Sequence, residues 1–260
     1  MIDLHAHILP GVDDGPASIE EAVELARAAV DAGTRVLAAT SHVSHMFPTD
    51  PHVFPARLAE VRDALRDAGV GLEVVPGGEL APSRVAELDD DALRELALGG
   101  GPYLLVECPF SPVSAELEPL VHELQQRDWR ILLAHPERSA AFHREPERLV
   151  RLVDGGALVQ VTAGSLTGQF GQTARRFSVS ALRDGLVHVL ASDAHDAYDR
   201  PPGLAAGLAA AEHDLPGIGA QAEWLTDEIP AAILAGHELP PRPALPRRHR
   251  GLRGRMIRRA

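Results

Sequence analysis

The chain of 260 residues contains no lysine and a single cysteine, Cys108. One cysteine cannot form an intrachain disulfide, which favours a reducing compartment. A cysteine-dependent phosphatase needs an arginine six residues after its nucleophile, and Ser114 occupies that position, so this mechanism is excluded. The absence of lysine argues against amidohydrolase-type C–N cleavage, which usually needs a lysine to bridge two metal ions.

Long apolar runs are also absent. No stretch approaches the roughly 18 apolar residues that a membrane span requires. The N-terminal residues lack the basic and apolar regions of a signal peptide. With 45% hydrophobic and 24% charged residues, the composition is that of a globular protein rather than a collagen-like or disordered one. We therefore expect a cytoplasmic protein with no integral membrane segment.

The charge of the chain is unevenly distributed. Eight of its 25 arginines lie in the last 19 residues, which contain no acidic residue. Residues 1–241 carry 17 arginines against 37 acidic residues, a net charge of −20, which makes nucleic acid a poor candidate partner. We expect the Pro- and Arg-rich residues 241–260 to form a disordered tail. This tail could contact anionic surfaces, or it could serve only for solubility.

The body of the chain alternates short apolar runs with amphipathic stretches, a pattern typical of βα units around a parallel sheet. The expected strands are 1–5, 36–42, 72–80, 103–108, 130–135, 158–162 and 188–192. The expected helices are 18–32, 53–68, 83–97, 114–126, 145–153, 174–183, 204–212 and 218–235. No repeat or linker interrupts this pattern, so we expect one α/β domain over residues 1–240.

Histidine and carboxylate residues follow six of the seven expected strands. In a parallel β/α barrel the carboxyl ends of the strands meet at one rim, so these side chains should lie together. The candidates are His5, His7, Asp14, His42, Glu79, Glu107, His135, Asp193 and His195. Nine nitrogen and oxygen ligands are too many for one tetrahedral ion and suit two or three ions of higher coordination number. An acidic rim without metal is the alternative.

The donor types favour Mn, Fe, Zn, Co or Mg, because no sulfur ligand is needed. Strand alternation points Cys108 away from the cluster, as a small core residue. Arg138 and Arg200 lie close in sequence to candidate ligands, and arginine suits phosphate oxygens, although either could be an ordinary ion-paired residue. Residues 162–171 could offer backbone N–H groups to an anion.

These residues resemble the polymerase-and-histidinol-phosphatase (PHP) superfamily, and within it the bacterial tyrosine-protein phosphatases of the CpsB/CapC type, which are found with capsule and exopolysaccharide operons. The resemblance covers about residues 1–240. It rests on DLHAHILPGVDDG, ATSH, GGEL, ECP, AHPER, VTAGSLTGQFG and SDAHDAYDRPP. In two places the chain departs from the pattern: Val43 follows His42 where a second histidine is usual, and Cys108 replaces a phenylalanine. The Arg-rich tail is outside the pattern.

The resemblance implies a distorted parallel (β/α)7 barrel, similar to a TIM barrel, that binds up to three divalent ions, usually Mn²⁺. The implied ligand sets are His5, His7, Glu79 and Asp193 for one ion, Glu79, Glu107 and His135 for a second, and Asp14, His42 and His195 for a third. Asp14 is assigned rather than Asp13 because the superfamily's ligand directly precedes the glycine. Arg138 and Arg200 are implied to surround the phosphate, and His42 could supply a proton.

The implied function is metal-dependent hydrolysis of phosphotyrosine in proteins, with a bacterial tyrosine autokinase of capsule or exopolysaccharide synthesis as the partner. The same site could instead act on a small phosphomonoester such as histidinol phosphate. A third possibility is a metal-stabilised barrel that binds phosphotyrosyl proteins without catalysis. Sequence does not separate the two substrate classes, because it does not show where a phosphate lies in the pocket.

Overall fold

The computed structural model describes residues 1–111 and 115–245. Its strands are β1 Ile2–Ala6, β2 Val36–Ala39, β3 His42–Val43, β4 Glu73–Pro76, β5 Glu79–Leu80, β6 Tyr103–Glu107, β7 Arg130–Ala134, β8 Leu158–Thr162 and β9 Val189–Ala191. They pair in parallel in two sheets, with the orders β1-β2-β4 and β3-β5-β6-β7-β8-β9. The expected α/β class with parallel strands is confirmed.

Two of the expected strands are interrupted. Residues 36–42 form β2 and β3, and residues 72–80 form β4 and β5, so the prediction of continuous strands is wrong here. A Cβ atom on Gly77 would lie 2.9 Å from Cγ2 of Thr40, and one on Gly78 would lie 2.7 Å from Cδ2 of Leu96. The break in β4–β5 thus falls where two glycines allow close approach of neighbouring side chains.

Hydrogen bonds link the two sheets at the edge between β1 and β9. Ala6 and Ala194 form an isolated parallel bridge. The Asp193 N–H donates to the His5 carbonyl at 2.8 Å, and the His7 N–H donates to the Ala194 carbonyl at 2.8 Å. The first and last strands therefore bring their ends, and the histidines beside them, together.

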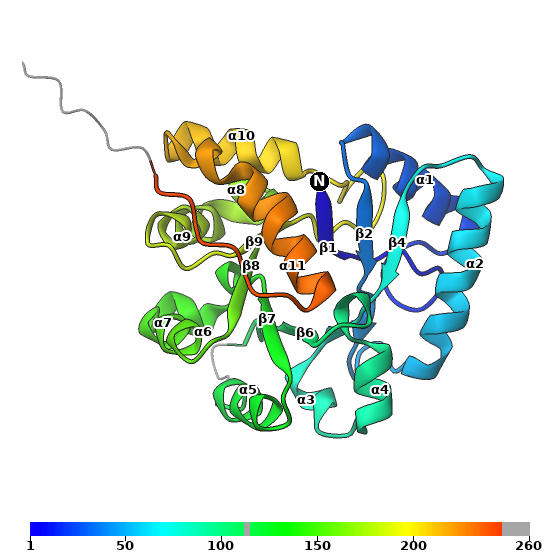
Figure 1. The fold of residues 1–260 in the computed structure, drawn as a ribbon, viewed down its shortest axis with the longest axis horizontal. Helices are drawn as coiled ribbons and strands as arrows, with labels where there is room; N and C mark the ends of the chain where they lie inside the picture. Colours follow the sequence, from blue (N-terminus) through cyan, green and yellow to red (C-terminus); the bar gives the residue numbers. More distant parts are fainter. Residues whose placement is uncertain (112–114, 246–260) are drawn as a thin grey trace, which may run out of the picture.

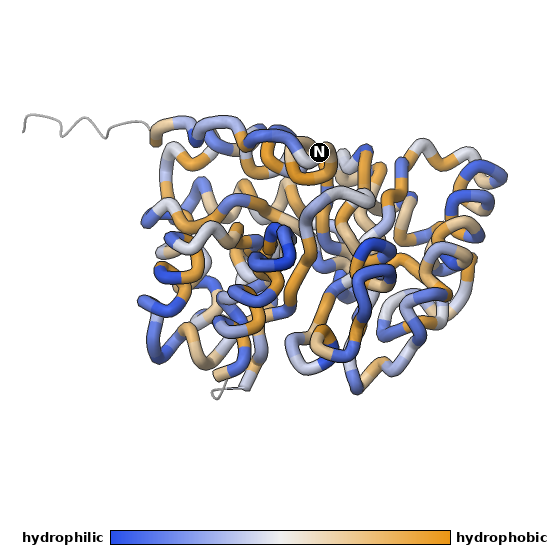
Figure 2. Tube along the Cα trace, turned by 60° about the horizontal axis from the view of Figure 1, so that its bottom comes forward, coloured by the Kyte–Doolittle hydropathy of each residue, from blue (hydrophilic) through white to orange (hydrophobic). Residues whose placement is uncertain are grey.

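The helices lie around the strands (Figure 1). The α-helices are α1 Ile19–Asp31, α2 Phe54–Asp67, α3 Pro82–Val85, α4 Asp90–Glu95, α5 Leu117–Gln126, α6 Ala140–Arg144, α7 Glu147–Asp154, α8 Ala163–Thr167, α9 Gly171–Arg183, α10 Leu204–Asp214 and α11 Ile229–Ala235. Apolar segments run through the interior, while hydrophilic segments lie mainly on the outer helices (Figure 2). α1 shows why: its buried face consists of Ala22, Leu25, Ala26 and Ala29.

Local signals explain where some helices begin. The Ser18 side chain accepts a hydrogen bond from the Glu21 N–H at 3.3 Å and caps α1. The single helix expected over 83–97 is wrong, because the Asp89 side chain accepts from the Ala92 N–H and begins a separate helix, α4. The helix expected over 218–235 is likewise divided, by a π-helical segment at Trp224–Glu228.

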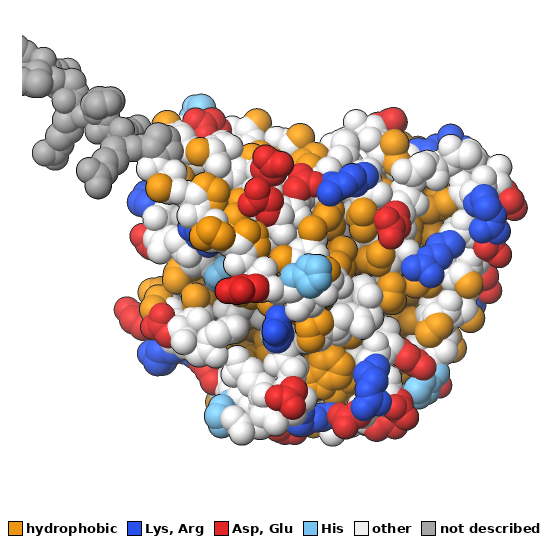
Figure 3. Space-filling view, viewed as in Figure 1, with side chains coloured by type: hydrophobic (Ala, Val, Ile, Leu, Met, Phe, Trp, Pro, Cys, Tyr) orange, Lys and Arg blue, Asp and Glu red, His pale blue; other side chains and the backbone are white. Residues whose placement is uncertain are grey.

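The C-terminal part of the described chain covers the amino ends of the strands. Arg130, at the start of β7, donates to the carbonyl of Gly236, just after α11, at 3.4 Å. The Arg242 guanidinium lies 4.2 Å from the centre of the Trp224 ring, so residues 241–245 of the expected tail contact the body, while 246–260 lie outside the described residues. On the face that carries α11, acidic and basic side chains are interspersed (Figure 3).

This arrangement leaves the carboxyl ends of the strands free for a site. None of the helices in the described ranges is long and apolar enough to cross a membrane.

Candidate metal centre

All nine residues predicted as metal ligands lie together at the carboxyl ends of the strands. They form four overlapping groups, and within each group the donor atoms lie within 4.8 Å of one another. The groups are His7, Asp14, His42 and His195; His5, His7 and Asp193; His5, Glu79 and His135; and His42, Glu79 and Glu107. A cavity of about 400 Å³ opens beside them and is also lined by Arg138 and Arg200.

Glu79 lies at the centre of the cluster and is fully buried. Its Oε1 is 2.7 Å from Nε2 of His135, and its Oε2 is 2.9 Å from Nδ1 of His42 and 3.3 Å from Nε2 of His5. Burial opposes the charge of this carboxylate, but the surrounding histidines hold the pKa of Glu79 well below its ordinary value. A charged carboxylate that faces several nitrogen donors at once suits a bridging ligand.

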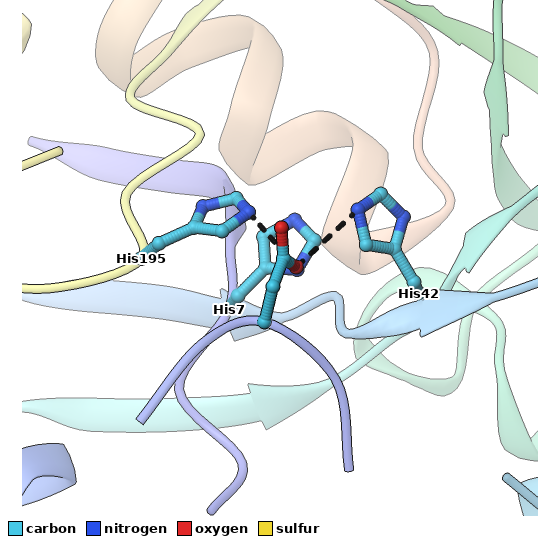
Figure 4. A group of neighbouring side chains, drawn as sticks. His7, His42 and His195 are labelled. Atoms are coloured by element: carbon cyan, nitrogen blue, oxygen red, sulfur yellow. Dashed lines mark ion pairs between the residues drawn. The ribbon is translucent and has the colours of Figure 1, made fainter. Parts of the chain in front are cut away.

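Asp14 faces two histidines from different parts of the chain. Its Oδ1 is 3.3 Å from Nε2 of His195 and 3.6 Å from Nε2 of His42. These two rings approach from opposite sides, with His7 between them (Figure 4). The set Asp14, His42 and His195 that the resemblance implies is therefore brought together, and His7 joins it.

The neighbouring carboxylate, Asp13, instead makes hydrogen bonds with His7, Gly15 and the backbone of His42. Its Oδ2 lies 2.7 Å from Nδ1 of His7 and accepts from the His42 N–H at 2.8 Å, while Oδ1 accepts from the Gly15 N–H at 3.0 Å. When His7 donates through Nδ1, its Nε2 lone pair faces the cluster. Asp13 thus orients a predicted ligand, which the sequence analysis did not foresee.

Gln160 of β8 also orients a predicted ligand, His5, and was not predicted from the sequence. This fully buried side chain places Oε1 3.1 Å from Nδ1 of His5 and accepts from the His135 N–H at 3.2 Å. It thereby directs Nε2 of His5 towards Glu79. The available signal was one amide within the apolar run of β8.

Asp193 connects the histidines with the two arginines. Its Oδ1 lies 3.4 Å from Nε2 of both His5 and His7. Its Oδ2 accepts from Nη1 of Arg138 at 2.6 Å and from Nη2 of Arg200 at 2.8 Å. Burial opposes ionisation, yet the neighbouring histidines and Arg200 hold the pKa of Asp193 well below its ordinary value. Both guanidinium groups therefore lie next to the cluster, at the cavity.

In the segment that could have offered backbone N–H groups to an anion, the first N–H already pairs with an internal carboxylate. Oε1 of the buried Glu137 accepts from the Thr162 N–H at 2.9 Å and from Oγ of Ser165 at 2.7 Å. Burial raises the pKa of Glu137 to about 6. Cys108 is fully buried, as predicted for a core residue, and burial raises the pKa of its thiol well above the ordinary value.

The donor atoms fit divalent metal ions. Nδ1 of the buried His135 has no hydrogen-bond partner among the described residues, and a buried polar atom costs about 1–3 kcal/mol when it is left unsatisfied. Burial and the neighbouring Glu79 charge also raise the pKa of Glu107 to about 7, a cost that a cation would relieve. Imidazole and carboxylate donors suit hard and borderline ions.

The fold and this donor cluster define an α/β protein with a candidate metal-binding centre at the carboxyl ends of parallel strands. The chain belongs to the family described as capsular polysaccharide synthesis, CpsB/CapC, whose model matches residues 1–219.

Relatives with known names support this membership. Tyrosine-protein phosphatase YwqE of Bacillus subtilis (strain 168) is 36% identical over 201 residues, which cover 77% of this chain and 79% of YwqE. Putative tyrosine-protein phosphatase CapC of Staphylococcus aureus is 35% identical over 205 residues, which cover 77% of this chain and 79% of CapC.

Solved structures agree with the fold. A chain from the crystal structures of YwqE from Bacillus subtilis and CpsB from Streptococcus pneumoniae, described as unique metal-dependent tyrosine phosphatases, matches with a TM-score of 0.81 and 31% identity. The match covers 94% of this chain and 99% of that one. An organophosphorus hydrolase from Deinococcus radiodurans matches with a TM-score of 0.52 at 15% identity, which shows a likeness of fold alone.

Proposed function

We propose that this protein is a metal-dependent protein-tyrosine phosphatase that acts in capsule or exopolysaccharide synthesis. The observation that carries the proposal is the convergence of nine metal-type donors and two arginines on one cavity, with Asp193 in contact with both sets. The names of the relatives support the reaction and the substrate class. A small phosphomonoester such as histidinol phosphate is less favoured, because the relatives are named for tyrosine phosphatase activity.

The proposed scaffold is a distorted (β/α)7 barrel over residues 1–240. Three observations support it: β2 leads directly into β3, β4 leads into β5, and the β1–β9 hydrogen bonds link the two sheets. In such a barrel the strand ends would form one continuous rim around the cluster.

The proposed ligands are the nine clustered residues, in the sets that the family resemblance implies, with Mn²⁺ as the preferred ion and room for up to three ions. When bound, such ions supply Lewis acidity, which activates water at neutral pH and neutralises phosphate charge. Asp13 and Gln160 hold the rings of His7 and His5, so that two of the donors are oriented before any ion binds.

The arginines would hold the substrate phosphate. Arg138 and Arg200 are only 19% and 26% exposed, and Asp193 fixes both guanidinium groups at the cavity. Their remaining N–H donors can bind the equatorial oxygens, where charge develops during in-line transfer. The leaving phenolate needs little protonation, because the pKa of tyrosine is about 10. His42, which lines the cavity, is the proposed source of that proton.

The proposed partner is a phosphotyrosyl protein, in particular a bacterial tyrosine autokinase, in the cytoplasm. We also propose that the Arg-rich C-terminal segment contacts anionic surfaces. Truncation after Leu245 tests this second point and spares the contacts of Arg242 with the body. Loss of binding to anionic vesicles supports the contact, and unchanged binding refutes it.

Phosphate release tests the main proposal. Protein stripped with a chelator and reconstituted with Mn²⁺ is compared on a phosphotyrosyl peptide, a phosphoseryl peptide of the same sequence, and histidinol phosphate. We expect metal-dependent release with a preference for phosphotyrosine. Preference for histidinol phosphate would move the function to small-molecule metabolism, and no release from any substrate by metal-loaded protein would refute enzymatic function.

A further inference from the structure

Apolar side chains are exposed at the mouth of the cavity. Among the described residues, six large hydrophobic side chains are exposed, and two of them, Met46 (81% exposed) and Phe110 (48%), line this cavity. Phe47 lines it as well. Exposed apolar side chains gathered at a polar site are unfavourable in water and typical of a surface that binds an apolar group.

The two phenylalanines lie flat against histidines of the cluster. The rings of Phe47 and His42 are 5.2 Å apart between centroids and inclined by 4°. The rings of Phe110 and His135 are 5.6 Å apart and inclined by 8°. The two loops that carry them follow β3 and β6. Each ring is thus held in one orientation beside a metal-type donor, while Phe110 stays nearly half exposed.

Phe110 also touches the phosphate-binding group that we propose. The Arg138 guanidinium lies 4.8 Å from the centre of the Phe110 ring and 4.3 Å from that of Phe170. Phe170 does not line the cavity, whereas Phe110 does. A phosphate held by Arg138 would therefore have its ester substituent close to Phe110.

We infer that Met46, Phe47 and Phe110 form an aromatic lip that binds the phenyl ring of the substrate and selects aryl over alkyl phosphomonoesters. The inference rests on the proposed function and adds the residues that determine specificity. An aryl ring can stack on phenylalanine and contact the methionine sulfur. A phosphoserine side chain presents the same phosphate without a ring, so it cannot make these contacts.

The variants that test the lip are Phe110→Ala and Met46→Ala, with Phe170→Ala and Val150→Ala as controls. Mn²⁺-loaded proteins are compared by kcat/KM on phosphotyrosyl and phosphoseryl peptides of one sequence. We expect Phe110→Ala to lower kcat/KM for phosphotyrosine about five- to tenfold more than for phosphoserine, the size of an aromatic pair interaction. Met46→Ala should shift the ratio in the same direction.

The controls separate ring binding from the positioning of Arg138. Phe170→Ala removes a ring that contacts Arg138 outside the cavity. It should therefore lower kcat/KM by the same factor for the phosphotyrosyl and the phosphoseryl peptide. Val150 is 39% exposed on α7 and does not line the cavity, so Val150→Ala should change neither. If Phe110→Ala lowers kcat/KM by the same factor for both peptides, as expected for Phe170→Ala, then Phe110 acts only through Arg138 and the lip is refuted.

A binding measurement makes the test independent of turnover. Calorimetry with phenylphosphonate and methylphosphonate compares an aryl with an alkyl ligand. The wild-type protein and its variants can hydrolyse neither ligand. We expect tighter binding of phenylphosphonate, with the difference reduced in Phe110→Ala. If the wild-type protein releases no phosphate yet shows this difference, the proposed function fails and the lip stands. Equal affinities, or no binding of either phosphonate, would overturn the lip.

Discussion

Asp13 and Asp14 are adjacent carboxylates with different contacts, and substitution of each by asparagine separates their roles. The Asp14 carboxylate faces the rings of His42 and His195. The Asp13 carboxylate instead hydrogen-bonds with Nδ1 of His7 and with the backbone N–H groups of His42 and Gly15. We expect Asp14→Asn to remove about one bound metal ion, because the amide replaces a charged oxygen donor. Asp13→Asn should leave the number of ions unchanged and weaken their binding.

The size of the Asp13 effect follows from its three hydrogen bonds, at 2.7, 2.8 and 3.0 Å. An asparagine side chain has one acceptor oxygen, so it cannot keep all three, and it removes the charge that favours donation from Nδ1 of His7. Loss of a partner that orients a ligand typically lowers metal affinity about 10- to 100-fold, or roughly 1.4–2.7 kcal/mol.

Metal content after dialysis gives the number of ions, and competition with a chromophoric chelator gives the affinity. Thermal unfolding of both variants without metal shows whether the loop around Gly15 still folds. The reasoning is refuted if Asp13→Asn loses an equivalent of metal while Asp14→Asn keeps the full number at wild-type affinity.

Three further substitutions test other parts of the structure. His135→Ala should lower kcat on the order of a hundredfold and reduce metal content, so near-normal turnover would exclude His135 as a ligand. Arg200→Ala should raise KM and lower kcat, with kcat/KM down by about a hundredfold, and unaltered kinetics would make Arg200 purely structural. Burial and the charge of Arg242 lower the pKa of His188 from 6.5 to about 4, so the folded state resists protonation. The stability that depends on neutral His188 is present above pH 6.5 and is lost as the pH falls towards 4, by up to about 3 kcal/mol. His188→Gln keeps an acceptor for the Val159 N–H, and urea unfolding at pH 7 and pH 4 should show a smaller acid loss than in the wild type; equal losses would contradict this.

Much of the fold was predictable because its signals are local. The parallel strands follow from the alternation of apolar runs with amphipathic helices, and Ser18 marks the start of α1. The strand interruption at Gly77 and Gly78 did not follow from the apolar pattern, and the close approach of Thr40 to Gly77 and of Leu96 to Gly78 exists only in the folded chain. The division of the helix expected at 83–97 had a local signal in Asp89 that the apolar pattern outweighed.

The positions of the donor residues at the strand ends could be read from chain order, since the parallel topology places them on one rim. The orientation of those side chains depends on contacts that form only in the folded chain. Gln160 holds His5 across 155 positions of sequence, and Arg138 reaches Asp193 across 55. Helical and strand periodicity relate only residues that are close in sequence, so they do not predict such contacts. These contacts form only when the strands have paired and the helices have packed around them.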